Sequence, residues 1–200
     1  MKQVICPLGV GAYFEYWGFP REMILEGDWD DPIALDRDLT VHLLPARHYS
    51  GRLFSKNTTL WAGFAVVSSH RSIFFSGDSG YGPHFSIIGR RFGGFDLVLL
   101  DCGQYDPRWA SIHMTPEEAA QAARDLGARA FMPAHVGRFT IANHPWDEPF
   151  RRLADVSRNA SYRLVTPKIG EPLKAESPST NFPEWWLEIE QSHVAALSAN

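Results

Sequence analysis

The chain has 200 residues, of which 44% are hydrophobic and 21% are charged, a composition typical of an ordinary globular protein. Its net charge of −4 provides no basic surface, which argues against a nucleic-acid partner. Two cysteines are too few for a disulfide framework. No signal peptide is recognisable, and the longest apolar run, Leu60 to Val67, is far too short to span a membrane. We therefore expect a cytoplasmic protein with one domain over residues 1–173, followed by a linker and helical tail over residues 174–200.

The first part of the chain predicts short strands separated by loops. Lys2 to Ile5 is a strand candidate, and Leu39 to Leu44 is a second strand that ends at Pro45. Pro20 to Glu26 predicts one short helix, because proline fits the first helical turn. The acidic segment from Asp28 to Asp38 is rich in turn residues, and we expect one strand inside it.

Strands and helices alternate from residue 60 onward, which predicts an α/β fold. Leu60 to Val67 and Ser72 to Ser76 are two strands joined by a polar turn, as in a hairpin. Pro83 to Phe92 has the apolar spacing of a helix and is followed by two glycines. Phe95 to Leu100 is a continuous apolar run, so we expect a central strand covered on both faces.

A strong helix signal opens the second half of this alternation. Thr115, Pro116 and Glu118 have the pattern of a capping box, and the helix that they start is expected to stop at Gly127. Three further elements are expected: a strand over Ala130 to Met132, a helix over Glu148 to Arg158, and a terminal helix over Glu184 to Leu197 that sets Trp185 and Trp186 against an apolar surface.

Three polar residues follow short apolar strands and suggest a metal site. His48 and His135 each come shortly after a strand and before a glycine, and Asp78 follows the strand that ends at Ser76. Imidazole and carboxylate ligands suit zinc, and also manganese or iron. The alternative is structural: Asp78 would cap a turn and the histidines would be packed or surface residues. A metal at this position would favour hydrolysis, because a bound ion acidifies water.

Other polar residues are candidates for supporting roles. His113, just before the capped helix, is able to donate a proton to a leaving group or to pack beside the cap. Asp101 follows the central strand, where it is able to orient a ligand histidine. Arg47 and Arg52 are candidates for holding a phosphate or for pairing with the acidic loop over residues 28–38. His144 is a weaker candidate of the same kind as His113.

A series of sequence blocks resembles one family of metallo-β-lactamase-fold hydrolases. In chain order the blocks are PARHYSGR, NTTLWAGF, FFSGDSGYGPHF, FDLVLLDCGQYDPRW, IHMTPEEA, PAHVGRF and HPWDEP. They resemble N-acyl-phosphatidylethanolamine-hydrolysing phospholipase D from about Val4 to about Leu153. The resemblance implies the C-terminal part of an αβ/βα sandwich and hydrolysis of a phosphodiester in a phospholipid or other lipid-like substrate, with peripheral membrane contact. It further implies a pair of metals, usually zinc, bound by His48, Asp78 and His135, with His113 at the active site and Asp78 shared between the metals.

The sequence departs from this family in one important way. The family's first metal motif, His-x-His-x-Asp-His, is absent, and no His-x-His occurs anywhere in the sequence. We therefore expect the N-terminal part of the fold to be missing, which leaves each metal short of three ligands and one sheet face uncovered. Two alternative functions follow: an inactive paralogue that acts by association, for instance as a homo-oligomer, and a lactonase or sugar-phosphate hydrolase on the same fold. Trp185 and Trp186 are expected to form a partial cover for the open face.

Overall fold

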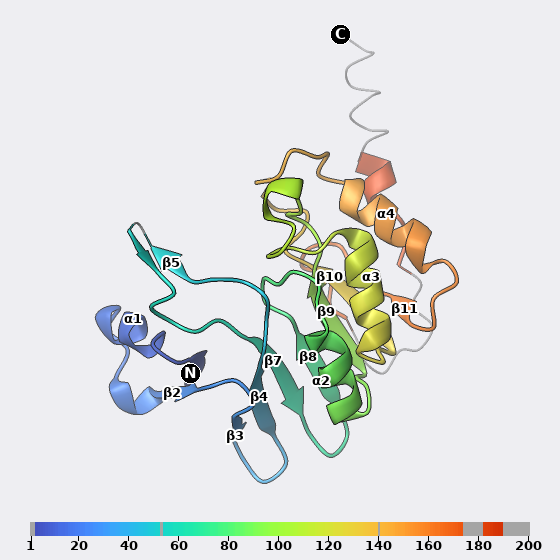
Figure 1. The fold of residues 1–200 in the computed structure, drawn as a ribbon. Coiled ribbons are helices and arrows are strands. Elements are labelled where there is room, and N and C mark those ends of the chain that lie inside the picture. The colour runs from blue at the N-terminus through green and yellow to red at the C-terminus, as the bar shows by residue number, and fades with distance from the viewer. Residues whose placement is uncertain (1–2, 53, 140, 174–181, 190–200) are drawn as a thin grey trace.

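The computed structural model describes residues 3–52, 54–139, 141–173 and 182–189. Its main feature is a mixed seven-stranded sheet with the order β11-β10-β9-β8-β7-β4-β3 (Figure 1). Strands β8 to β11 run parallel, whereas β3, β4, β7 and β8 are joined by antiparallel pairing. The strands are β3 (Pro32–Ala34), β4 (Thr40–Leu44), β7 (Gly63–Val67), β8 (Ser72–Phe75), β9 (Leu97–Asp101), β10 (Ala130–Ala134) and β11 (Arg163–Leu164).

Three helices pack on one face of this sheet and form the main core (Figure 1). They are α2 (His84–Phe92), α3 (Pro116–Asp125) and α4 (Glu148–Ser157). The predicted capping box of α3 is confirmed, because Thr115 and Glu118 exchange both hydrogen bonds. The predicted end of α2 is confirmed as well, since Gly93 adopts a left-handed conformation that glycine accepts without strain. The buried side chains between helices and sheet include Phe74, Phe85, Val98, Leu100, Phe131 and Leu153.

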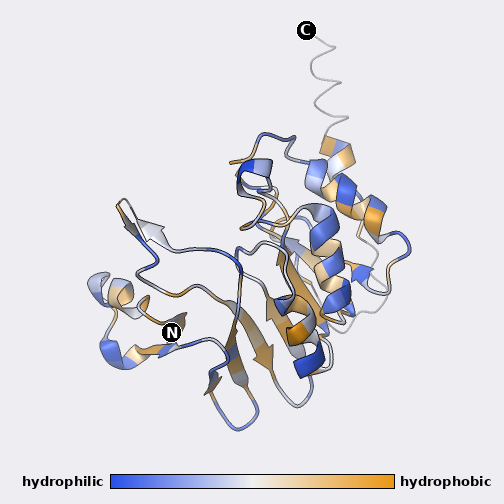
Figure 2. Ribbon diagram, viewed as in Figure 1, coloured by the Kyte–Doolittle hydropathy of each residue, from blue (hydrophilic) through white to orange (hydrophobic). Residues whose placement is uncertain are grey.

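The expectation of a central strand covered on both faces was wrong. On β9, Val98 and Leu100 are fully buried against the helices, whereas Leu97 and Leu99 on the other face are only partly buried. The neighbouring strand β8 shows the same alternation, with Phe74 1% exposed and Phe75 42% exposed. Strands β7 to β9 are therefore rich in apolar residues on both faces (Figure 2), but the helices cover only one of the two faces.

The N-terminal segment forms a small unit beside β4. Strands β1 (Val4–Pro7) and β2 (Ile24–Gly27) pair in parallel, and α1 (Gly11–Tyr16) lies between them in sequence. The predicted helix over Pro20 to Glu26 was wrong: only Arg21–Met23 forms a single 3-10 turn, and the next residues join a strand. Pairing of Ile24–Gly27 with the first strand outweighs the local helical preference. Strands β5 (Gly51–Arg52) and β6 (Ser55–Lys56) form a separate hairpin.

The C-terminal tryptophans pack on α4. Residues 185–189 are helical, and Trp185 and Trp186 are buried against Phe150, with Val136 and Ala154 beside them. The two tryptophans therefore do not cover the open face of strands β7 to β9. The predicted linker from Lys174 to Asn181 lies outside the described residues. No helix within the described ranges is long and apolar enough to cross a membrane.

Candidate metal centre

The sheet topology brings the polar strand ends to one edge. Strands β8, β9 and β10 are parallel, and two antiparallel pairings through β7 give β4 the same direction. His48, Asp78 and His135 follow β4, β8 and β10, and Asp101 is the last residue of β9. Because the carboxyl ends of these strands meet at one edge, side chains from distant parts of the sequence gather there.

Backbone hydrogen bonds hold the His48 segment against the Asp78 loop. The backbone N–H of Arg47 donates to Ser79 Oγ at 2.9 Å, and the N–H of Gly80 donates to the Arg47 carbonyl at 2.9 Å. The guanidinium of Arg47 donates to the Tyr81 carbonyl, also at 2.9 Å. Arg47 therefore has a structural role: it joins the two loops, and Asp30 in the acidic segment pairs with Arg91 instead.

The structure brings together a group of side chains that differs by one residue from the predicted metal ligands. Ligand atoms of His48, Asp78 and His113 all lie within 4.8 Å of one another. His135 lies beside this group, with its Nε2 atom 3.9 Å from Oδ2 of Asp78. The four side chains form one group, with ring centroids of His113 lying 5.3 Å from His48 and 5.4 Å from His135.

Hydrogen bonds fix which nitrogen each of two histidines presents. His48 Nδ1 lies 2.7 Å from the Tyr49 carbonyl, and His113 Nδ1 lies 2.6 Å from Asp101 Oδ2. Both partners are acceptors, so both Nδ1 atoms carry the proton and both Nε2 atoms keep a lone pair. This is the tautomer that a metal-binding imidazole needs.

Asp101 is the buried anchor of this group. It is fully buried at the end of β9, and its Oδ2 also accepts the N–H of Ser79 at 3.3 Å. Burial raises the pKa of the Asp101 carboxyl, and the bond and charge of His113 partly offset that rise. Burial lowers the pKa of His113, but the hydrogen bond and charge of Asp101 outweigh it, so the net shift is upward. The histidine that Asp101 contacts is therefore His113.

Close backbone contacts place the loops that carry His113 and His135. A Cβ atom on Gly103 would lie 2.1 Å from the His135 carbonyl oxygen, and one on Gly80 would lie 2.2 Å from the Ser111 carbonyl oxygen. Only glycine allows these approaches. His135 itself has φ +56°, a left-handed conformation that costs a non-glycine residue about 1–3 kcal/mol. Such strain is concentrated at functional sites in proteins.

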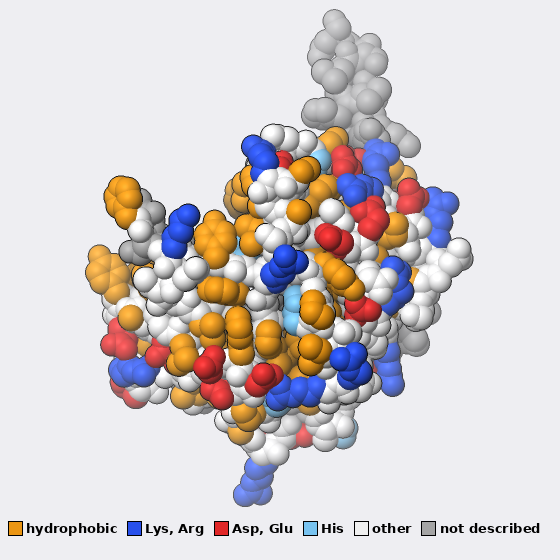
Figure 3. Space-filling view, in the orientation of Figure 1, with side chains coloured by type: hydrophobic (Ala, Val, Ile, Leu, Met, Phe, Trp, Pro, Cys, Tyr) orange, Lys and Arg blue, Asp and Glu red, His pale blue; other side chains and the backbone are white. Residues whose placement is uncertain are grey.

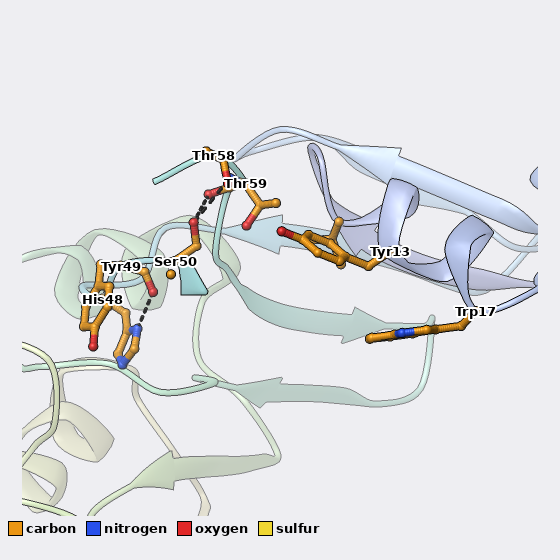
Figure 4. Close-up of a pocket in the computed structure, with 9 residues that line it drawn as sticks. Tyr13, Trp17, His48, Tyr49, Ser50, Thr58 and Thr59 are labelled. Atoms are coloured by element: carbon orange, nitrogen blue, oxygen red, sulfur yellow. Dashed lines mark hydrogen bonds between the residues drawn. The ribbon is translucent and has the colours of Figure 1, made fainter. Parts of the chain in front are cut away.

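A cavity of about 320 Å³ opens beside His48. Its walls come from α1, from the loop after β4 and from the segment after β6, and Figure 4 shows the labelled side chains around it. Tyr13 and Trp17 form one side, His48 and Tyr49 another, and the Ser50 hydroxyl donates to the Thr59 carbonyl at 2.7 Å. The rings of His48 and Tyr49 are stacked, with planes 3° apart. The aromatic-rich sequence over residues 13–19 is the signal from which this cavity could have been found.

The remaining candidates lie outside the centre. His144 stacks on Tyr105 with a centroid distance of 4.3 Å, and its Nδ1 donates to the Pro145 carbonyl. For Arg52 the structure describes the backbone, which belongs to the β5–β6 hairpin.

The architecture is a metallo-β-lactamase-like α/β fold with a polar centre at the edge of its mixed sheet. A family model described as the beta-lactamase superfamily domain matches residues 1–136. The chain belongs to this superfamily. The solved structure of Igni18, described as a novel metallo hydrolase from the archaeon Ignicoccus hospitalis, superposes with a TM-score of 0.60. That match has 18% sequence identity and covers 83% of this chain and 65% of Igni18, which shows a shared fold.

Two curated relatives are more similar in sequence. An uncharacterized protein of Mycobacterium tuberculosis is 42% identical over 185 residues, which are 91% of this chain and 49% of the relative. The mitochondrial N-acyl-phosphatidylethanolamine-hydrolyzing phospholipase D of Saccharomyces cerevisiae is 31% identical over 178 residues, or 84% of this chain and 38% of the enzyme. The chain therefore spans about half or less of the length of these relatives.

Proposed function

We propose that the protein is a metal-dependent hydrolase that cleaves a phosphodiester of phospholipase D type in a lipid-like substrate. The observation that carries this proposal is the convergence of His48, Asp78, His113 and His135 at one sheet edge. Three imidazoles and one carboxylate from four separate segments meet there. Membership of the beta-lactamase superfamily and the likeness to the yeast phospholipase D support the same reaction class.

The donor set fits a transition metal. Imidazole nitrogen and carboxylate oxygen are ligands of zinc, manganese and iron, and ligand atoms of His48 and His113 lie within 4.8 Å of an Asp78 oxygen. His135 Nε2 lies 3.9 Å from the same carboxylate, and a carboxylate with two oxygens would be able to bind a second ion together with this histidine. A bound ion would acidify water and supply hydroxide near neutral pH.

The residues of this chain have further tasks around such an ion. Asp78 is 48% exposed as a side chain, so the centre is open to a substrate from solvent. His113 is held by Asp101 through Nδ1, which leaves its Nε2 free either to move a proton or to bind the ion. His135 has its Nε2 3.9 Å from Asp78 Oδ2 and a left-handed backbone conformation.

The cavity beside His48 supports a lipid-like substrate. His48 is shared between the cavity and the metal centre, so a molecule that fills the cavity has one end next to the metal ligands. Tyr13, Trp17 and Tyr49 offer aromatic surface to an apolar group. Hydrophobic side chains also gather outside the cavity on α1 and at the tip of the β5–β6 hairpin (Figure 3), where Tyr16 is 86% exposed and Phe54 fully exposed. Aromatic residues of this kind favour contact with a membrane surface.

A comparison of substrates tests the proposal. The metal-loaded chain should hydrolyse a phospholipid in mixed micelles at least tenfold faster than a lactone or a sugar phosphate at equal concentration. Asp78→Asn should abolish turnover, and His70→Ala, on an exposed turn away from the centre, should leave it unchanged. Preference for the lactone or the sugar phosphate would show that the protein hydrolyses a different class of bond. Absence of turnover on all three, with the chain folded and loaded, would favour a role in association.

A further inference from the structure

We propose that His113 is itself a metal ligand, which completes a three-ligand set with His48 and Asp78, and that Asp101 is the positioning residue that holds it. This inference rests on the proposed metal-dependent function. It assigns His113 a place in the metal's coordination shell, where the sequence predicted proton transfer. A catalytic zinc normally has three protein ligands, and this set provides three from one chain.

The first argument is the match between the two histidines. Each uses Nδ1 to donate to an oxygen, the Tyr49 carbonyl for His48 and the Asp101 carboxylate for His113. Each therefore presents an Nε2 lone pair, and ligand atoms of both lie within 4.8 Å of each other and of an Asp78 oxygen. Zinc ligands lie about 2.0–2.2 Å from the ion, so a small closing movement brings all three into contact with it.

The second argument is the state of Asp101. Its side chain is fully buried, and its second oxygen, Oδ1, has no hydrogen-bond partner among the described residues. A buried carboxylate with an unsatisfied oxygen is costly unless positive charge lies nearby. A cation on Nε2 of His113 provides that charge through the imidazole. Carboxylate, histidine and metal in this order are a recurrent arrangement that orients the ring and strengthens the ligand.

The third argument is rigidity. The His113 side chain is only 12% exposed, whereas that of His135 is 33% exposed. The chain on either side of His113 is fixed, by close packing of Ser111 on Gly80 and by the capping box that begins at Thr115. Because His113 is held in place before any ion arrives, it loses little freedom on binding. His135, which is more exposed and 3.9 Å from Asp78 Oδ2, is not needed for this three-ligand set.

Cobalt titration of the metal-free chain tests the inference directly. Co²⁺ would be added to the wild-type protein and to His113→Ala, Asp101→Asn, His135→Ala and the control His70→Ala, with visible absorption and chelator competition as readouts. His113→Ala should weaken the first Co²⁺ site at least 100-fold and change its absorption bands. Asp101→Asn should weaken that site 10- to 100-fold, as expected for a residue that orients a ligand. His135→Ala and His70→Ala should leave it within threefold. Circular dichroism would establish that each variant is folded.

Two results would overturn the inference. One is a His113→Ala protein that binds the first Co²⁺ with wild-type affinity and spectrum; the other is a wild-type chain that binds no Co²⁺. The outcome is separable from that of the proposed function. Tight Co²⁺ binding that depends on His113, without hydrolysis of any phosphodiester, would support His113 as a metal ligand and contradict the proposed phosphodiesterase function. Wild-type turnover by metal-loaded His113→Ala would contradict His113 as a metal ligand and remain consistent with the proposed function.

Discussion

Asp101 and His113 form a 2.6 Å hydrogen bond at the end of the central strand, and this bond connects the core of the fold to its polar centre. Asp101 is the last residue of β9 and is fully buried, while His113 belongs to the loop before α3. The hydrogen bond therefore fixes the His113 ring relative to the sheet, and a ligand atom of His113 lies within 4.8 Å of an Asp78 oxygen.

Replacing Asp101 by asparagine should reverse the pKa shift of His113. Burial lowers this pKa, and in the wild-type protein the hydrogen bond and charge of Asp101 raise it above its usual value of 6.5. A raised pKa stabilises the fold at low pH, and this contribution is lost as pH rises through the folded-state value. Without the carboxylate, the pKa of His113 should fall below 6.5. NMR titration of the metal-free proteins measures both values, and an unchanged pKa in Asp101→Asn would contradict the assignment.

His84 should make the protein less stable in mild acid. Burial, helped by the nearby Arg47 charge, lowers the pKa of His84 from 6.5 to about 4. Between these values the unfolded chain binds a proton that the folded chain refuses, so stability falls as pH drops from about 6.5 to about 4. The shift corresponds to a loss of about 3 kcal/mol. Urea unfolding of the metal-free wild type and of His84→Gln across this pH range tests it, and equally steep losses in both proteins would show that other groups are responsible.

Adjacent residues on β8 should respond very differently to truncation. Phe74 is 1% exposed and packs against Phe85 and Phe95, so Phe74→Ala should cost about 3–5 kcal/mol of unfolding free energy. Phe75 points to the open face of the sheet and is 42% exposed, so Phe75→Ala should cost about 1 kcal/mol. Denaturant unfolding gives both numbers. Equal costs would mean that the second face is covered in solution.

The same open face motivates the proposal of homo-oligomers. Ile73 and Phe75 are exposed on β8, and partly buried apolar residues flank them on β7 and β9. Exposed apolar surface of this kind favours association. Light scattering should detect a dimer whose dissociation constant rises at least tenfold in Phe75→Ser. A monomeric wild-type chain that binds no hydrophobic dye would exclude this association.

Removing the C-terminal segment should destabilise the domain. Trp186 is 1% exposed and stacks on Phe150 of α4, and the Trp185 indole donates to the Thr166 carbonyl at 3.0 Å. A chain that ends at Ser177 should therefore lose about 3–5 kcal/mol of unfolding free energy. Ile189→Ser, which changes an exposed residue of the same helix, should lose less than about 0.5 kcal/mol. A truncated chain as stable as the full-length chain would show instead that residues 1–173 form a domain that does not need the C-terminal segment.

The gathering of His48, Asp78 and His135 could be predicted from the sequence because each follows a short apolar strand. Parallel strands place their carboxyl ends at one edge, so local pattern was enough. The pairing of Asp101 with His113 could not be predicted in the same way, since it depends on how the loop before α3 packs on Gly80. Ile24 to Gly27 shows the opposite failure: its local sequence favoured a helix, but pairing with a strand twenty residues earlier decided its structure. The open sheet face was expected from the family resemblance, but the strand itself predicted the opposite, because Leu97 to Leu100 has apolar residues for both faces and only tertiary structure shows which face the helices cover.

The measurement that most directly tests the central claim is the metal content of the purified chain, determined by mass spectrometry alongside hydrolysis of a chromogenic phosphodiester. We predict one to two zinc, manganese or iron ions per chain, loss of metal and of at least 99% of turnover in Asp78→Asn, and recovery of wild-type turnover when metal is returned to chelator-treated protein. Folded wild-type protein that contains no metal, takes up none of these three ions and hydrolyses no phosphodiester would contradict the account.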